Sequence, residues 1–186
     1  MLSYLRRSLV ISAIFIVLLG LAYPLLGTGL AQLAFSHQAN GSIGPDGSTL
    51  IGQQWKGPEW FQGRPSATID AAGKPSPYDA MASGAANLGP RSRLLEKEVA
   101  RQAARLRREG ITPTNELVTS SASGLDPDIS PRSAYAQVSA VARARRLPVA
   151  EVRRLVASHI HPAQLGFLGA PYVNVLDLNM ALAALK

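Results

Sequence analysis

Two aspartates and two histidines are the side chains whose types and spacing could support acid–base or metal chemistry in this sequence. Asp126 and Asp128 stand two residues apart in "SGLDPDISP", and His159 and His161 form an H-x-H pair. A metal site needs three or more convergent ligands, and each pair offers only two. Neither pair is therefore a strong signal for a metal by itself.

The residues around the aspartates also fit a turn that enters a helix. Gly124 supplies a turn, and Asp126 is pushed out of the helical region because it precedes Pro127. Ser130 is a good helix N-cap, and Asp128 lies near the positive end of the helix that follows. We interpret the stretch as a turn and cap, with a metal site and a partner contact as the alternatives.

Two further loops carry candidate binding residues. "FQGRPSA" holds Arg64 and Ser66, and an arginine on a rigid loop binds an anion or fixes the loop to backbone carbonyls. "ASGAANLGP" has the small residues of an anion-binding loop before a helix, but it lacks the Gly-Lys-Ser/Thr ending of a P-loop. There is no G-x-S-x-G, no H-E-x-x-H and no cysteine, so the residues alone predict no catalytic and no metal residues.

The elements that must position these residues begin with an apolar N-terminal segment. Leu9 to Leu30 is long enough to cross a bilayer as a helix, and Arg6 and Arg7 precede it. The positive-inside rule then puts the N-terminus in the cytoplasm. We predict residues 1–7 inside, a transmembrane helix over 8–31, a linker over 32–49 and an extracytoplasmic domain over 50–186. A cleaved signal peptide is the competing hypothesis.

Without Arg6 and Arg7 the formal net charge of +7 becomes +5, and most of that excess lies in "RSRLLEKEVARQAARLRREG". This segment has no aromatic residues to stack on bases, which argues against nucleic-acid binding. It fits a solvated helix face, or a docking face for an acidic partner or anionic lipid headgroups.

Periodicity predicts three helices and a late strand in the external domain. The helices cover about 92–109, 131–146 and 148–158, "YVNVLDLN" (172–179) alternates as a strand does, and "TLIGQQW" fits a short strand. The fold class is α/β: a single N-terminal transmembrane helix followed by one mixed α/β domain. The side chains expected to face the core are Leu95, Val99, Gln102, Ala103, Leu106, Ala134, Tyr135, Val138, Val141, Val152, Leu155 and Val156, with Trp55, Trp60 and Phe61 pinning the loop before them.

The segments taken together resemble the C subunit family of the bacterial Kdp-type potassium-transporting P-type ATPase. The resemblance rests on "YPLL", "QANGS", "LIGQ", "FQGRPSA", "SGAANLGP", "LVTSSASGLDPDISP" and "VNVLDLNMAL", in this order from the membrane span to the last residues. It implies a non-catalytic accessory subunit of a high-affinity potassium uptake pump in the bacterial inner membrane. The implied partners are a potassium-translocating subunit, a P-type ATPase subunit that hydrolyses ATP, and a small stabilising peptide.

The resemblance also implies a catalytic chaperone that raises the ATPase subunit's affinity for ATP, with nucleotide contacts at Ser83, Gly84 and Asn87. The family typically has Ser-Gly-Gly-Ser-Asn here, whereas this chain has Ala85 and Ala86 in place of the second glycine and the serine. That departure weakens direct nucleotide binding, and ATP lies on the opposite side of the membrane from the predicted domain. We expect no tightly bound cofactor, and any effect on ATP to be allosteric.

Docking onto the partners is the role we expect for five polar residues: Arg64, Ser66, Asp126, Asp128 and Asn174. A cysteine introduced at Ser121 is expected to react with an impermeant reagent from outside the cell. The rival hypotheses are a membrane-anchored periplasmic enzyme that uses Asp126, Asp128 and a histidine, and a secreted binding protein if the apolar segment is cleaved.

Overall fold

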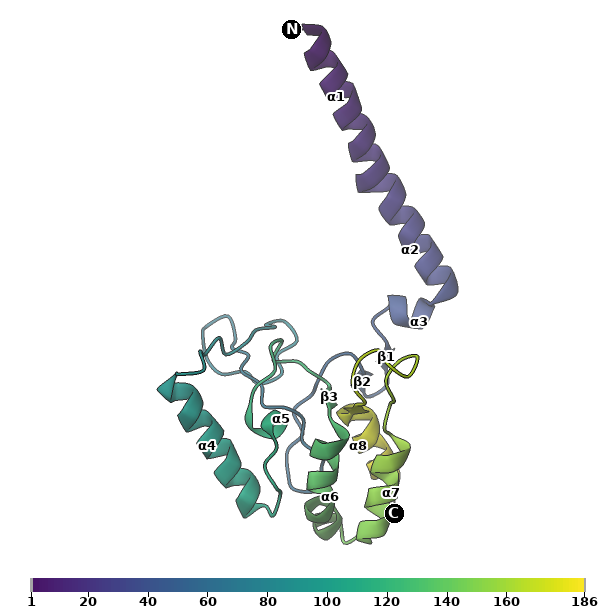
Figure 1. Ribbon diagram of the computed structural model, residues 1–186. Coiled ribbons are helices and arrows are strands. Elements are labelled where there is room, and N and C mark those ends of the chain that lie inside the picture. Colours follow the sequence, from purple (N-terminus) through teal and green to yellow (C-terminus); the bar gives the residue numbers. More distant parts are fainter. Residues whose placement is uncertain (1, 186) are drawn as a thin grey trace. The chain divides into compact units, whose positions relative to one another are not determined.

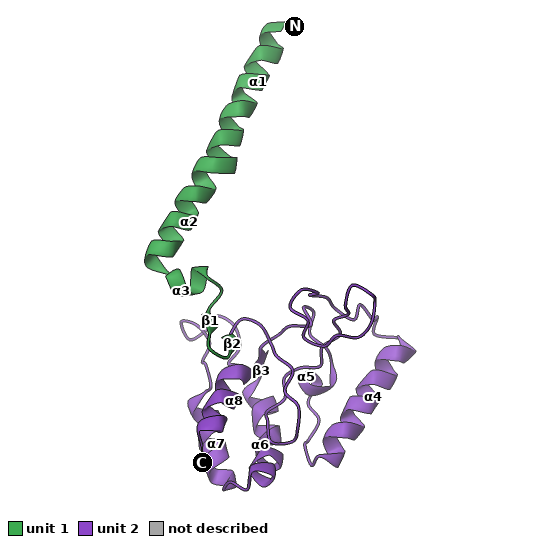
Figure 2. Cartoon of the chain, turned by 180° about the vertical axis from the view of Figure 1, so that it is seen from behind, with its two compact units in different colours: residues 1–48 green, residues 49–186 purple. Residues whose placement is uncertain are grey.

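The chain forms two compact units, residues 1–48 and 49–186 (Figure 2). The computed structural model describes residues 2–185. Met1 and Lys186, the outer ends of the predicted segments 1–7 and 50–186, lie outside the described residues.

The first unit is dominated by one continuous apolar helix, which runs from Leu2 to Ala34 over 33 residues and is long and apolar enough to cross a membrane. It comprises α1 (Leu2–Val17), the π-helical turn η1 (Leu18–Ala22) and α2 (Tyr23–Ala34). The π turn comes directly before Tyr23 and Pro24. Proline cannot donate to the carbonyl four residues back, and a local π adjustment accommodates that loss in an apolar helix.

The rest of the first unit has short regular elements where the sequence suggested only a linker. Helix α3 covers Ser36–Ala39, and strands β1 (Ile43–Gly44) and β2 (Gly47–Ser48) pair antiparallel. The Ser48 hydroxyl donates to the carbonyl of Gly41 at 2.7 Å, which ties the hairpin to the chain before it.

The second unit is a mixed region of helices and very short strands (Figure 1). Its helices are α4 (Arg93–Arg108), α5 (Asn115–Val118), α6 (Pro131–Arg145), α7 (Val149–Ser158) and α8 (Val175–Ala184). Strand β3 (Asp128–Ile129) pairs antiparallel with β4 (Val173–Asn174), with Asp128 opposite Asn174. The mixed composition agrees with the prediction, but each strand has only two residues, so helices and irregular segments carry the fold.

The three helices predicted from periodicity are confirmed as α4, α6 and α7, and their ends follow the expected signals. Ser130 caps α6 by accepting from the N–H of Ser133 at 3.3 Å. Gly110 ends α4 with a φ of 77°, and the N–H of Ile111 donates to the carbonyl of Leu106 at 2.8 Å. This is the Schellman arrangement that a glycine after a helix makes possible.

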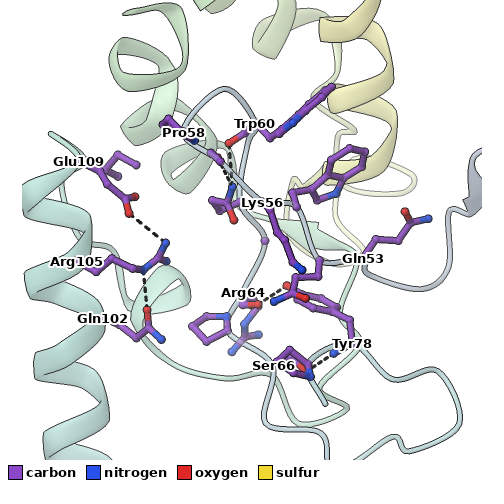
Figure 3. A pocket seen from close by; sticks show the side chains of 18 of the residues that line it. Gln53, Lys56, Pro58, Trp60, Arg64, Ser66, Tyr78, Gln102, Arg105 and Glu109 are labelled. Atoms are coloured by element: carbon purple, nitrogen blue, oxygen red, sulfur yellow. Dashed lines mark hydrogen bonds and ion pairs between the residues drawn. The ribbon is translucent and has the colours of Figure 1, made fainter. Parts of the chain in front are cut away.

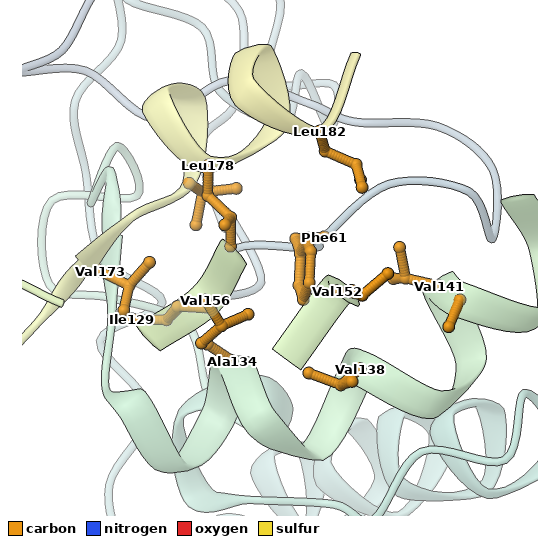
Figure 4. Close-up of a cluster of buried hydrophobic side chains, with 12 residues drawn as sticks. Phe61, Ile129, Ala134, Val138, Val141, Val152, Val156, Val173, Leu178 and Leu182 are labelled. Carbon is orange, nitrogen blue, oxygen red and sulfur yellow. The ribbon is translucent and has the colours of Figure 1, made fainter. Parts of the chain in front are cut away.

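The main core lies between α6, α7 and α8 (Figure 4). Phe61 enters it from the irregular segment before α4 and is fully buried, as predicted, while Trp55 and Trp60 pack against its edge. The buried side chains are Phe61, Ile129, Ala134, Val138, Val141, Ala142, Val152, Val156, Val173, Val175, Leu178 and Leu182. A second, smaller cluster joins the end of α4 to α5 and α6 through Leu106, Ile111, Leu117 and Ala140.

The predicted strand over 172–179 is wrong beyond Asn174. Helix α8 begins at Val175, because the Asn174 side chain accepts from the N–H of Asp177 at 3.2 Å and so caps the helix. Asparagine is among the best capping residues, and burial of Leu178 and Leu182 then outweighs the strand preference of the valines. The short strand predicted for "TLIGQQW" is also absent, and those residues form a turn and an irregular segment.

The buried stripe predicted for the first helix is only partly confirmed. Of α4, Leu106 alone is fully buried, while Leu95 and Val99 stay partly exposed. Helix α4 lies at the edge of the unit (Figure 1), and of its residues the smaller buried cluster includes only Leu106 near its C-terminal end, so Leu95 and Val99 stay partly exposed.

Two buried amide side chains hold the segment that carries Phe61. Asn179 accepts from the N–H of Phe61 and donates to its carbonyl, both at 2.9 Å. Gln137 does the same for Gln62, at 2.8 and 3.0 Å. These side chains satisfy backbone groups that a neighbouring strand would otherwise pair with, so an irregular segment can lie against the core.

Candidate functional site

The predicted docking residues of "FQGRPSA" and "SGLDPDISP" lie together in the second unit. The Arg64 guanidinium forms an ion pair with Asp126, with Nη1 3.2 Å from Oδ2, and donates through Nη2 to the carbonyl of Ser120 at 3.2 Å. Their side chains are 27% and 30% exposed, so the pair is half-buried. Arg64 therefore locks two loops that are 62 residues apart in the chain.

Tyr78 closes this pair from a third loop. Its hydroxyl donates to the carbonyl of Arg64, and its N–H donates to the hydroxyl of Ser66 at 2.9 Å. Burial raises the pKa of Tyr78 to about 12, with the charge of Asp126 adding to the rise and that of Arg64 opposing it. No sequence motif singled out Tyr78, because its role depends on contacts across the loop.

Asp126 forms the predicted turn. Its Oδ1 accepts from the N–H of Asp128 at 3.1 Å while Oδ2 faces Arg64, so both carboxylate oxygens are held inside the chain. Gly124 has a φ of 70°, and a Cβ there would lie 2.5 Å from Thr68 Cγ2, so only glycine fits. The local geometry is that of a turn leading into β3 and α6.

Asp128 and Asn174 meet across the β3–β4 pair. Asn174 Nδ2 donates to Asp128 Oδ1 at 3.0 Å and to the carbonyl of Thr49 at 2.8 Å. Burial is the main reason that the pKa of Asp128 lies above its usual value, and nearby Asp126 and Asp177 raise it further. The bond from Asn174 and the charge of His161 oppose that rise.

The loop with the candidate nucleotide residues packs against the same turn. The Ser83 hydroxyl and the Gly84 N–H both donate to the carbonyl of Ser123, at 3.1 and 2.8 Å. Asn87 is exposed and has a φ of 51°. The two donors that a phosphate would use at Ser83 and Gly84 are thus bonded within the chain.

Glu116 is a polar centre that sequence reasoning missed. Its Oε2 accepts from the N–H of Ser130 at 2.8 Å, from the Ser130 hydroxyl at 2.7 Å and from the Ser133 hydroxyl at 2.7 Å. Burial alone raises the pKa of Glu116, but these bonds and the charge of Arg64 outweigh it and hold the pKa below its ordinary value. A carboxylate at the N-terminus of α6 is favourable because it faces the positive end of the helix dipole.

A groove of about 890 Å³ opens between the 53–66 segment and α4 (Figure 3). Arg105 is fixed on its α4 wall by Gln102 at 3.1 Å and Glu109 at 3.4 Å. Aromatic and basic side chains line the groove: Trp55, Trp60, Tyr78, Lys56, Arg64, Arg101, Arg105 and Arg108. This basic lining fits the hypothesis that α4 offers a docking face for an acidic partner or for anionic lipid headgroups.

The two histidines make separate contacts, and His161 lies near enough to Asp128 for its charge to act on that carboxyl. His159 lies at the end of α7 with Nδ1 2.8 Å from the carbonyl of Leu155, and His161 stacks on Tyr172 with ring centroids 4.8 Å apart. Across residues 2–185, no group of three or more histidine, aspartate and glutamate side chains is arranged to hold a metal ion.

Comparison with known proteins agrees with the order of motifs along the chain. Residues 5–184 match the family described as "K+-transporting ATPase, c chain". This chain belongs to that family. Among curated relatives, the potassium-transporting ATPase KdpC subunit of Sorangium cellulosum is 50% identical, covering 98% of both chains.

Other members of the c-chain family are similar over the same extent. The KdpC subunit of Caulobacter vibrioides is 50% identical over 99% of this chain and 94% of its own, and that of Yersinia enterocolitica is 45% identical over 98% and 93%. The c-chain match thus includes both the apolar helix and the second unit.

Proposed function

We propose that this chain is a non-catalytic accessory subunit of an ATP-driven potassium uptake pump. The main support for this proposal is the match to the c-chain family from residue 5 to residue 184, because the match covers both the apolar helix and nearly all of the second unit. The helix anchors the chain in the inner membrane, and the second unit helps hold the translocating and ATP-hydrolysing subunits and the small peptide together.

The second unit lies on the outer side of the membrane in this proposal. Arg6 and Arg7 at the N-terminal end of the apolar helix favour an inside N-terminus. Potassium enters from the outer side and ATP is bound on the other, so a higher ATP affinity of the ATPase subunit is an allosteric coupling through the complex. Direct nucleotide contact at Ser83, Gly84 and Asn87 stays a prediction, which the internal bonds of Ser83 and Gly84 do not favour.

Four of the five polar residues are partly exposed and take part in docking mainly by shaping the surface. The prediction of a direct contact at Asn174 is not supported, because Asn174 is only 6% exposed and its amide is bonded to Asp128 and to the carbonyl of Thr49. Arg64 and Asp126 keep part of their side chains exposed while bonded to each other, so a partner meets a preformed pair. The same bonds make the enzyme hypothesis less attractive, because a catalytic Asp126 would need a free oxygen and both of its oxygens are held.

Co-purification tests the proposal. The full chain is tagged after Lys186, the membranes are solubilised gently, and the eluate is analysed by mass spectrometry and assayed for potassium-stimulated ATP hydrolysis. We expect a P-type ATPase and a large multi-span protein to co-elute with that activity. A tagged single-span protein from the same cells is the control, and a chain that elutes without these partners would contradict the proposal.

The coupling to ATP needs its own measurement. In complexes prepared with and without this chain, we expect its removal to raise the KM for ATP more than it lowers kcat, as loss of an affinity effect requires. An unchanged KM in an intact remaining complex would limit the chain to assembly.

A further inference from the structure

The loop between α7 and β4 exposes a group of large apolar side chains. Leu165 is 83% exposed, Phe167 74% and Leu168 49%. Residues 162–171, "PAQLGFLGAP", contain no charged side chain. Apolar side chains scattered singly over a surface need no explanation, but a contiguous exposed group marks an interaction site.

The backbone holds this loop in one shape. The N–H of Gln164 donates to the carbonyl of Leu168 at 2.9 Å, and the N–H of Leu168 donates back to the carbonyl of Gln164 at 2.8 Å. At the base of the loop, His161 and Tyr172 exchange two more backbone bonds, at 2.8 and 3.0 Å, and their rings stack. The apolar side chains are therefore presented by a closed turn with a fixed base.

Leu165 adopts a backbone conformation that leucine rarely takes. Its φ is 54°, in the left-handed region, and Gly166 and Gly169 on the same loop have φ values of 82° and 79°. A residue held in such a conformation at an exposed position points to function, since no burial of the side chain repays the strain.

We propose that the apolar loop, residues 163–169, inserts Leu165 and Phe167 into an apolar pocket on the outer face of another subunit of the same pump. The inference rests on the proposed function, because it needs the partner subunits. A rigid loop binds with little loss of conformational freedom, and a few side chains buried in well-packed pockets carry most of the energy at protein interfaces.

The bilayer surface is a weaker occupant for this loop. Segments that lie in the membrane interface combine apolar side chains with lysine or arginine, which bind the lipid headgroups. Residues 162–171 have the apolar side chains but contain no lysine and no arginine. The fixed backbone also presents the two side chains in one arrangement, which matches a pocket of defined shape better than a fluid lipid surface. In addition, the loop leads through β4 to Asn174, which is only 6% exposed but donates to the partly exposed Asp128, so the loop is joined through the β3–β4 pair to one of the proposed docking residues.

Photo-crosslinking in intact membranes identifies what covers the loop. The variant Phe167→p-benzoylphenylalanine is expected to form an adduct with another pump subunit, identified by mass spectrometry. Leu94, an exposed apolar residue of α4, is the matched control position and should give much less of that adduct. An adduct with lipid, a yield no greater than at Leu94, or no adduct at all would overturn the proposal.

A pair of substitutions measures what the loop contributes. Leu165→Ser with Phe167→Ser is expected to reduce recovery of the partner subunits at least tenfold while leaving the denaturant midpoint of the full chain unchanged, since both side chains are exposed. Leu94→Ser is the control and should keep full recovery. Full recovery with the double variant would overturn the loop's role and leave the proposed function standing, whereas a wild-type chain that recovers no partner would contradict the proposed function itself.

Discussion

At the scale of single residues, the second unit is held by polar side chains that reach across long stretches of chain. Tyr78, Arg64 and Asp126 tie three loops together, and a Cβ at Gly52 would lie 2.7 Å from the Tyr78 ring and 2.6 Å from the carbonyl of Asp126. Gly52 therefore lets the segment before Trp55 approach both the Tyr78 loop and the Asp126 loop. The surface proposed for docking is therefore built from contacts that also stabilise the fold.

Tyr78 gives this network an alkaline limit. Its pKa of about 12 lies above the ordinary value of 10.0, so its contribution to stability is complete below pH 10 and is lost as the pH rises toward 12. Tyr78→Phe is expected to lower stability at neutral pH and to remove the late phenolate titration seen by ultraviolet absorbance. Tyr135→Phe is the control, and a late titration that survives Tyr78→Phe would contradict the assignment.

The amide of Gln137 is expected to stabilise the fold more than its size suggests. Gln137→Leu keeps a similar volume but leaves the N–H and carbonyl of Gln62 without their partner, at a cost of roughly 2–4 kcal/mol. The free energy of unfolding is measured on the full chain in detergent by the fluorescence of Trp55 and Trp60, both in the second unit. Ser139→Leu, at an exposed site of α6, should change it by less than about 0.5 kcal/mol. Equal effects of the two variants would refute the role of the amide.

At the scale of elements, helix ends decide the architecture around the site. Asn174 is the last residue of β4 and caps α8 with its side chain, and Ser130 directly follows β3 and caps α6 with its side chain. Each two-residue strand thus passes directly into a helix, which is why the paired strands stay short. Their pairing places Asp128 beside Asn174 at the start of both helices.

Glu116 makes the start of α6 sensitive to acid. Because its pKa is held below the ordinary value of 4.5, its contribution is complete above that value and is lost as the pH falls through the lower, folded-state pKa. Glu116→Gln is expected to cost about 1 kcal/mol at pH 7, as loss of a helix cap does, and nearly nothing once the pH is well below 4.5. Glu96→Gln, an exposed glutamate in the first turn of α4, is the control. A cost that does not change with pH would rule out a charge effect.

At the scale of the whole molecule, the chain joins an apolar helix to a folded unit, and cysteine labelling tests on which side of the membrane that unit lies. The labelling site suggested by the sequence, Ser121, is unsuitable because that residue is only 4% exposed. Met81 is 95% exposed and lies in a loop, so a reagent can reach it.

Orientation is measured on cysteine variants of the otherwise cysteine-free chain. In intact cells, Met81→Cys is expected to react with a membrane-impermeant maleimide, whereas Ser3→Cys, at the N-terminal end of the apolar helix and ahead of Arg6, should react only after lysis. The reverse pattern would place the second unit inside and would require a different account of the coupling to ATP.

The sequence by itself determined the apolar helix, helices α4, α6 and α7, the caps at Ser130 and Gly110, and the family. These features depend on periodicity, capping chemistry and the order of short motifs, all of which are local. Only the tertiary structure decided that Gln137 holds the backbone of Gln62, 75 positions away, and that Asn179 holds the backbone of Phe61, 118 positions away. It also decided that Glu116 caps α6 and that α8 replaces the late strand. Contacts over such separations leave no local pattern, because they are selected by which buried groups need a partner once the core has formed.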